Sequence, residues 1–211
     1  MLSLATLRRA VKDALSFASS QTDVTEVEVF ASAGANLTVR LNYTSHIPSN
    51  GVEEPKSTEG YGLGIRATFR TPNGIKTGFG SEPTDLSVAG AERALEKARA
   101  GAVADAAFVS LPKHDSPQQP ALRDQEPLAN YDPALMRIRG KGLVNAGWSM
   151  MHRALDTFQS SEDLMGLAGS AEKMSELGLI LGGDVVMLQD RMAIGSTHIP
   201  KIQTEQNTLI M

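Results

Sequence analysis

The first twenty residues repeat apolar side chains at the spacing of an α-helix. The positions that would share one face are Leu4, Leu7, Val11, Leu15 and Ala18. This stripe predicts a folded amphipathic helix within residues 1–20. A transit peptide is the alternative for this basic segment, and Asp13 argues against it because such peptides are poor in acidic residues. The segment has no uninterrupted apolar run and no A-x-A cleavage site, which argues against secretion.

After this helix the apolar period changes from 3.6 to 2, which is typical of strands. Apolar and polar residues alternate over 26–32 and again over 37–43, and the segment between them contains Gly34 and Asn36. This pattern predicts a hairpin with one buried face. The following residues, 45–59, are rich in polar residues, proline and glycine and predict an exposed loop.

A second hairpin is predicted from residues 63–69 and 75–79. The intervening Pro-Asn-Gly, residues 72–74, is a strong turn signal because proline presets one dihedral angle and Asn-Gly accepts positive φ. Glycines at 60, 62 and 64 would weaken the first of these strands by their entropy. We therefore expect them to allow a bulge or the close approach of another group.

A helix is expected next, over residues 86–103, with Thr84 or Asp85 as its cap. Helices and hairpins are then segregated along the chain, which favours an α+β fold with a mainly antiparallel sheet packed against helices. Residues 111–133 contain five prolines, and this density predicts a surface connection or a domain boundary.

A further helix is expected from Asp132 and Pro133, with Trp148 and Met151 on its apolar stripe as core residues rather than a ligand platform. Strands at 177–181, 185–188 and 192–196, joined by turns, should follow it. The expected organisation is an N-terminal α+β domain at 1–110, a proline-rich connection at 111–132, and a helix followed by antiparallel strands at 133–211. The apolar end of the chain suggests that this last segment continues in a longer protein.

The composition removes several classes of function. The 211 residues include no cysteine, which excludes disulfides, thiol nucleophiles and thiolate metal sites. The formal net charge is -4 and only 5% of residues are aromatic, so neither a global basic field nor a rich stacking surface favours nucleic acid. The sequence also lacks the run of about 18 apolar residues that a membrane-spanning helix needs.

Candidate chemistry is sparse. The four histidines, His46, His114, His152 and His198, are scattered, and none is followed by glutamate as an H-E-x-x-H zinc helix requires. No P-loop and no G-x-S-x-G elbow occurs. The paired carboxylates at 53–54 and 162–163 lie in polar stretches, where a solvated role is expected. Arg66 is predicted to point away from the apolar face of its strand, where it could bind a carboxylate or remain a plain exposed arginine.

The order of these segments resembles the N-terminal region of the TldD/PmbA family, described as zinc metallopeptidases and formerly as modulators of DNA gyrase. The most specific similarity is a G-x-G-[IV]-R strand at 62–66, followed by a G-F return strand at 78–79 and a D-L helix start at 85–86. Shorter similarities lie at 25–30, 37–40, 183–185, 192–197 and 203–206.

The resemblance implies a non-catalytic part of a peptide-processing enzyme, because family members are much longer and their zinc helix, H-E-x-x-x-H in the TldD branch, lies outside the N-terminal region. We therefore carry over no catalytic residue, metal ligand or cofactor, and expect zinc only in the C-terminal part of a TldD-type member. The implied role is a substrate cavity wall and a dimer surface, in a homodimer or a heterodimer with a family member. A cytoplasmic protein with no nucleic-acid or membrane partner is expected.

Within this interpretation, the expected substrate contacts are Gly62, Gly64 and Arg66, because glycines in a sheet let a backbone or an extended peptide come close. Two other classes of function stay open. The chain could be a self-standing binding or assembly module with no enzymatic activity, or a small hydrolase that uses its scattered serine, histidine and aspartate residues.

Overall fold

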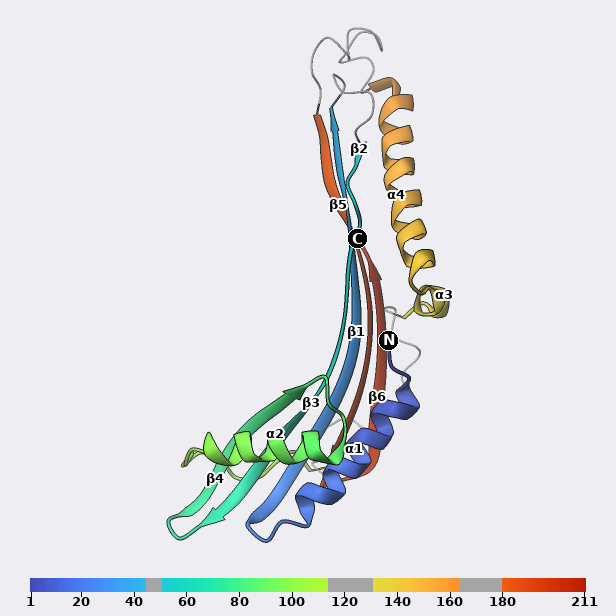
Figure 1. The fold of residues 1–211 in the computed structure, drawn as a ribbon. Helices are drawn as coiled ribbons and strands as arrows, with labels where there is room; N and C mark the ends of the chain where they lie inside the picture. The colour runs from blue at the N-terminus through green and yellow to red at the C-terminus, as the bar shows by residue number, and fades with distance from the viewer. Residues whose placement is uncertain (45–50, 114–130, 164–179) are drawn as a thin grey trace. The chain divides into compact units, whose positions relative to one another are not determined.

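The computed structural model describes residues 1–44, 51–113, 131–163 and 180–211. Figure 1 shows the helices and strands of this part of the chain. In order they are α1 (Leu4–Ser19), β1 (Val24–Thr44), β2 (Gly51–Val52), β3 (Lys56–Thr71), β4 (Gly74–Pro83), α2 (Val88–Ala100), α3 (Pro133–Arg137), α4 (Lys141–Ser160), β5 (Ile180–Ser196) and β6 (Ile199–Ile210). The predicted α+β class is confirmed.

The described strands form one six-stranded antiparallel sheet in the order β4-β3-β1-β5-β6, with the short β2 paired to β1. The chain divides into two compact units. The first comprises 1–34, 59–129 and 190–207, and the second comprises 35–58, 130–189 and 208–211. Each unit is thus assembled from three separate stretches, whereas the expected organisation placed its divisions in chain order at 110 and 132.

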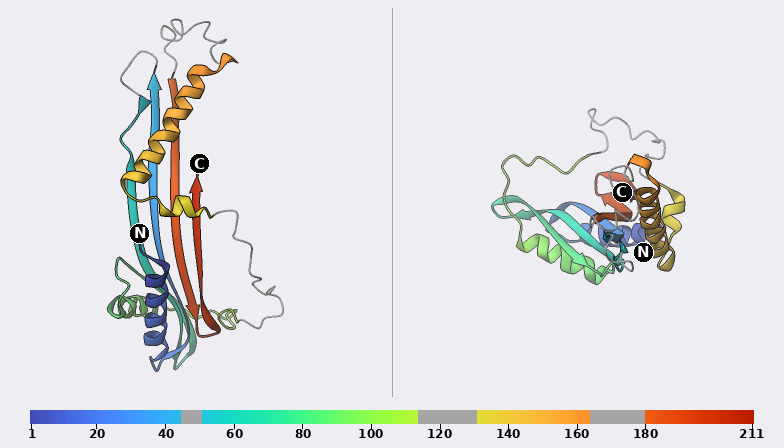
Figure 2. Two further views of the ribbon diagram at one scale, coloured as in Figure 1. Left: turned by 90° about the vertical axis from the view of Figure 1, so that its right-hand side faces the viewer. Right: turned by 90° about the horizontal axis from the view of Figure 1, so that it is seen from above.

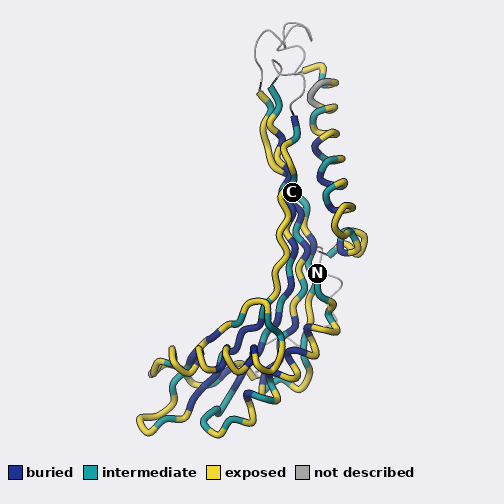
Figure 3. The backbone as a smooth tube through the Cα atoms, viewed as in Figure 1, coloured by how far each residue is buried: buried dark blue, intermediate teal, exposed yellow. Residues whose placement is uncertain are grey.

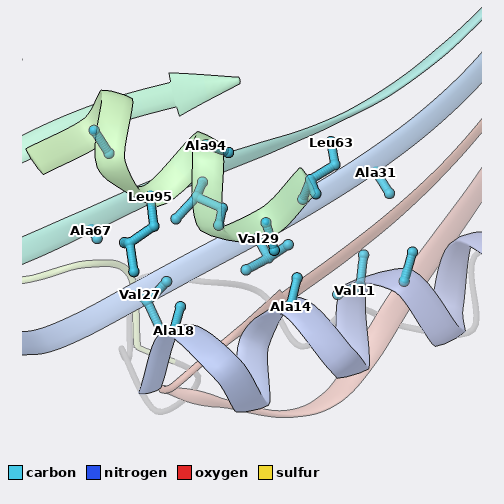
Figure 4. Close-up of a cluster of buried hydrophobic side chains, with 14 of the residues drawn as sticks. Val11, Ala14, Ala18, Val27, Val29, Ala31, Leu63, Ala67, Ala94 and Leu95 are labelled. Carbon is cyan, nitrogen blue, oxygen red and sulfur yellow. The ribbon is translucent and has the colours of Figure 1, made fainter. Parts of the chain in front are cut away.

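In the first unit, α1 and α2 cover one face of the sheet. Every second residue of β1 from Val27 to Ala33 points into this layer, and so do alternate residues of β3 and the small residues of both helices (Figure 4). Its buried members include Leu7, Val11, Ala14, Val27, Val29, Ala31, Leu63, Ile65, Ala67, Phe69, Ala94, Leu95 and Ala98. The predicted amphipathic helix is confirmed, since Leu7, Val11 and Ala18 are fully buried.

Two glycines of β4 set how closely α2 approaches the sheet. A Cβ atom on Gly78 would lie 1.9 Å from the carbonyl oxygen of Ala98, and one on Gly80 would lie 2.0 Å from that of Ala94. Both contacts are with the helix backbone, so any larger residue would force α2 away from β4. Hence the alanine-rich face of α2 packs directly on strand backbone at these positions.

Charged groups tie α2 and the residues before it to the end of β4. Arg93 pairs with Asp85 and, at 3.0 Å, with Glu82, while the Lys97 ammonium lies 2.7 Å from the second Glu82 oxygen. The main-chain N–H of Ser87 donates to Asp85 Oδ1 at 2.9 Å. Hydrogen bonds from Ser87, then the one from Arg93, lower the pKa of the Asp85 carboxyl to about 2.

In the second unit, α4 packs on the later part of β1 and the first part of β5 (Figure 2). The buried residues of this layer are Leu37, Val39, Leu41, Leu143, Met151, Val185 and Met187. Met151 is buried in this layer, as predicted, whereas Trp148 is half-buried, stacks on the exposed His152 and is not one of the buried residues of the layer. Among the described residues, no helix is both long and apolar enough to cross a membrane.

The hairpin predicted within residues 26–43 is wrong, because β1 runs unbroken through Gly34 and Asn36. Odd-numbered residues remain buried across the supposed turn, including Ala33 and Ala35. Unbroken main-chain pairing and a continuous buried face outweigh the local turn preference of glycine and asparagine. The predicted loop at 45–59 is also wrong at 51–52 and 56–59, which belong to β2 and β3, whereas 53–55 lie in no strand; residues 45–50 lie outside the described part.

Similar corrections apply near the C-terminus. The turns predicted at 182–183 and 190–191 are absent from β5, which is one strand over 180–196; residues 177–179 lie outside the described part. The single helix expected after Pro133 is two helices, α3 and α4, because the chain leaves helical geometry from Ile138 to Gly140, where φ of Gly140 is 45°.

The buried Gln189 side chain stabilises the break between α3 and α4. Its amide nitrogen donates to the carbonyl oxygens of Leu135 and Ile138, and its amide oxygen accepts from Arg139.

At the start of α2, Ser87 rather than Thr84 or Asp85 is the N-cap, since its hydroxyl accepts from the Gly90 N–H at 3.3 Å. The β3–β4 hairpin is confirmed, with Gly74 at φ 107° in its turn.

Candidate functional site

The three residues expected to contact substrate lie on β3, on the face of the first unit that α1 and α2 leave uncovered. Leu63 and Ile65 point into the helix layer, so Gly62, Gly64 and Arg66 point to the opposite side. We call this side the open face. Figure 3 colours the strands by burial, and buried positions alternate with intermediate ones along the first part of β1. The residues of the open face are Glu26, Glu28 and Phe30 of β1, Gly62, Gly64, Arg66, Thr68 and Arg70 of β3, and Ile75, Thr77, Phe79 and Ser81 of β4.

Gly64 allows the close approach that its sequence context predicts, and the group that approaches is the Phe30 side chain. A Cβ atom on Gly64 would lie 2.3 Å from Cε1 of Phe30. The Phe30 ring also stacks with that of Phe79, with ring centroids 6.1 Å apart and planes inclined by 6°. The open face therefore carries an aromatic pair from β1 and β4, with the glycine of β3 between their strands.

Gly62 and Gly60 have different surroundings. A Cβ atom on Gly62 would lie 3.2 Å from the carbonyl oxygen of Glu82 on the paired strand, whereas a Cβ atom on Gly60 would meet nothing within 4 Å. Of the three glycines, Gly64 is thus the one that a side chain covers closely.

Arg66 does bind a carboxylate, and the carboxylate belongs to its own chain. Its Nη2 donates to Glu28 Oε1 at 2.9 Å, with the Glu28 side chain 15% exposed and the Arg66 side chain 43% exposed. The Nε–H of Arg66 has no hydrogen-bond partner among the described atoms. Arg70 lies on the same face of β3 as Arg66, four residues further along the chain. It is exposed and makes no ion pair within the described residues.

A second polar cluster on this face was not foreseen from the sequence. Glu26 accepts from the main-chain N–H of Leu111 at 2.7 Å, and its other carboxylate oxygen lies 3.0 Å from Nε2 of His198. The carboxylate thereby joins β1, the segment that follows α2 and the turn between β5 and β6. The only sequence signal was the alternation of Glu26 and Glu28 with buried valines, which indicates their face but not their partners.

The edge of the sheet at β4 is occupied at two positions. Thr77 exchanges both main-chain hydrogen bonds with Val103, at 2.9 and 3.0 Å. The Ser81 carbonyl oxygen accepts from the Lys97 ammonium at 2.9 Å. An extended peptide would have to displace these groups to add to β4, so the open face offers its side chains rather than this strand edge for contact.

The described residues do not form a zinc site. Among them, no group of three or more histidine, aspartate or glutamate side chains could hold a metal ion. Glu26 and His198 pair with each other, and His152 is stacked on Trp148. His46 and His114 lie outside the described residues. The carboxylates at 53–54 and 162–163 are exposed, as expected for solvated groups.

Comparison with known proteins gives a likeness of fold. No family model matches the sequence, and the search of curated proteins gives no match. Among solved structures, the chain is similar to TldE from Thermococcus kodakarensis, a protein of the TldD/PmbA family, with a TM-score of 0.57 and 10% sequence identity. The likeness covers 96% of this chain and 37% of the TldE chain, so this chain spans little more than a third of that protein's length.

Proposed function

We propose that this chain is a non-catalytic part of a TldD/PmbA-type peptidase, in which it forms a wall of the substrate cavity and a dimer surface during peptide processing. The observation that carries the proposal is the fold likeness to TldE across 96% of the chain. The family's segment order in the sequence supports the same assignment, because it follows the strands and helices of the first unit.

The open face supports a role in contact rather than in bond cleavage. It combines exposed apolar side chains with arginine, a composition typical of binding surfaces. The carboxylate and imidazole groups that the structure places there are engaged with partners of the same chain: Glu28 with Arg66, and Glu26 with His198 and Leu111. These contacts position strands and connections, and they leave the reaction to residues of another polypeptide segment or subunit.

The experiment has two arms, both on the full chain. In the first, the purified chain is incubated with unstructured peptides and with ester substrates, with and without added zinc, and products are separated by chromatography. We expect no hydrolysis. Turnover by the chain alone would refute the proposal and would support the small-hydrolase alternative.

In the second arm, the chain is mixed with a TldD-type subunit that carries the H-E-x-x-x-H helix. We expect the two to elute together in size-exclusion chromatography with light scattering, and we expect peptide cleavage by the subunit to change when the chain is present. If the chain neither associates with the subunit nor changes its cleavage, the proposed role is wrong and a self-standing module becomes the better explanation.

A further inference from the structure

We propose that the open face of the first unit binds an extended, acidic peptide segment through a patch made of Phe30, Arg66, Arg70, Ile75 and Phe79. We call this set the aromatic–arginine patch. The inference rests on the proposed function in that it names the class of peptide that such a chain would contact. The ligand it fits carries one aromatic or large aliphatic side chain and two carboxylates at a defined spacing.

The spacing follows from the strand register. Arg66 is paired with Phe79 and Arg70 with Ile75, so each arginine has an apolar residue beside it on the neighbouring strand. Arg70 lies four positions after Arg66, which corresponds to about 13 Å along a strand. The Phe30 ring covers Gly64, one step further along the same face. The patch therefore presents, in order along β3, an aromatic position, a cationic position and a second cationic position.

An extended peptide has the same period as β3, so alternate side chains would meet alternate strand positions. An aromatic residue placed over Phe30 and Gly64 puts a carboxylate two residues later at Arg66 and another four residues beyond that at Arg70. The matching probe is Phe-Ser-Glu-Ser-Ser-Ser-Glu, together with its reversed sequence, because the peptide can run in either direction.

The charges of the patch favour an anionic ligand. Glu28 is largely covered and already paired with Arg66, whose side chain stays 43% exposed although its Nε–H is buried. Arg70 is exposed and has no ion pair within the described residues. Guanidinium groups match the planar, two-oxygen geometry of carboxylates.

The apolar part of the patch is open to a partner. Phe79 is 55% exposed and Ile75 is 54% exposed on β4, whereas Ile65 and Phe69 of β3 are buried on the opposite face. Aromatic residues and arginine dominate the energetically important positions of protein interfaces.

The test measures binding of the fluorescein-labelled probe peptides to the full chain by fluorescence anisotropy. We expect saturable binding that weakens between 50 mM and 300 mM salt, since exposed charge pairs are screened. Arg66→Gln and Arg70→Gln should each weaken binding by about fivefold, the effect of an exposed ion pair worth about 1 kcal/mol. Phe79→Ser should weaken binding of the probe further. A probe with both glutamates replaced by glutamine should bind to the wild-type chain as weakly as the original probe binds to the variant that carries both Arg66→Gln and Arg70→Gln.

The matched control is Arg8→Gln, which removes an exposed arginine from α1 and should leave binding unchanged. Circular dichroism and thermal melting confirm that each variant keeps its fold. Equal binding by wild type and the Arg70 variant, equal binding of the glutamate and glutamine probes, or displacement of the peptide by single-stranded DNA would each overturn the inference. These outcomes leave association with a TldD-type subunit untouched, so failure of the patch and failure of the proposed function are separate results.

Discussion

Gly80→Ala provides a sharp test of how α2 is packed on the sheet. The added Cβ atom would lie 2.0 Å from the carbonyl oxygen of Ala94 and 2.6 Å from the main-chain nitrogen of Ala98. Real Cβ atoms essentially never approach other heavy atoms below 3.0 Å. The distance to the Ala94 oxygen must therefore grow by at least 1.0 Å, from 2.0 to 3.0 Å, and because both contacts are helix backbone, α2 itself has to move.

The magnitude follows from what this movement separates. Ala91, Ala94, Leu95 and Ala98 of α2 are buried against the sheet. A gap of 0.5–1 Å loses roughly a quarter to a half of the dispersion energy of the contacts that it opens. Overpacking a core costs about 1–3 kcal/mol, and a contact between backbone atoms belongs at the upper end of that range. We expect Gly80→Ala to lower the free energy of unfolding by about 3 kcal/mol.

The assay is urea denaturation of the full chain, followed by circular dichroism, with thermal melting as a second measurement. For a chain of this size, about 3 kcal/mol corresponds to a melting temperature lower by roughly 6–12 °C. Gly60→Ala is the matched control, because its Cβ atom would meet nothing within 4 Å. We expect that control to lie within about 0.5 kcal/mol of wild type. If the two variants have the same stability, α2 does not lie on β4 as described.

Three further predictions concern single side chains. Asp85→Asn should lower the melting temperature at pH 7, and the difference should shrink as the pH falls from about 4 to 2. The folded pKa of about 2 lies below the ordinary 3.8, so the carboxylate stabilises the fold only above that range. Gln189→Leu should lower the free energy of unfolding by about 1–3 kcal/mol in urea titrations, because it removes the hydrogen bonds of a buried side chain to Leu135, Ile138 and Arg139. Gly64→Ala should be milder than Gly80→Ala, since the Phe30 ring can swing aside, but it should alter the near-ultraviolet circular dichroism of the aromatic pair.

The sequence predicted correctly the helices and the hairpin that depend on interactions between residues close together in the chain. The 3.6-residue period of residues 4–18 corresponds to α1, and the Pro-Asn-Gly turn forms the β3–β4 hairpin. In both cases the deciding interactions lie within a few residues of each other in the chain. The same holds for α2, although its cap lies at Ser87, two or three residues later than the residues proposed from the sequence.

β1 and β5 show how turn residues mislead when pairing partners lie far away in the sequence. Gly34 and Asn36 indicated a turn, yet the buried positions of β1 keep one parity from Val27 through Leu41. In β5 the buried positions Val185, Met187, Gln189 and Ala193 share one parity as well. If the chain reversed at a turn, the buried residues after the turn would not have to stay at odd-numbered positions. Buried residues at odd-numbered positions on both sides of a supposed turn were therefore the available signal for a single long strand.

The candidate site could be predicted only as far as its face. Alternation with Leu63 and Ile65 places Arg66 on the side away from the helices, and this was foreseen. Its partner Glu28 lies 38 residues earlier, so the pair depends on the register between β1 and β3. No sequence pattern in a single chain specifies that register. The contact of Phe30 with Gly64 and the Glu26–Leu111 hydrogen bond have the same origin.

The glycines of this sheet differ in the group that approaches each of them, and motif similarity does not show this difference. Gly78 and Gly80 lie beneath α2, whereas Gly64 lies beneath an aromatic ring on the side without helices. Both kinds of glycine stand in G-x-G patterns, so the pattern alone does not distinguish them. At 10% identity, the likeness to TldE likewise concerns the path of the chain and not the role of any residue. The chemistry of the open face therefore has to be measured on this chain's own side chains, beginning with Arg66, Arg70 and Phe79.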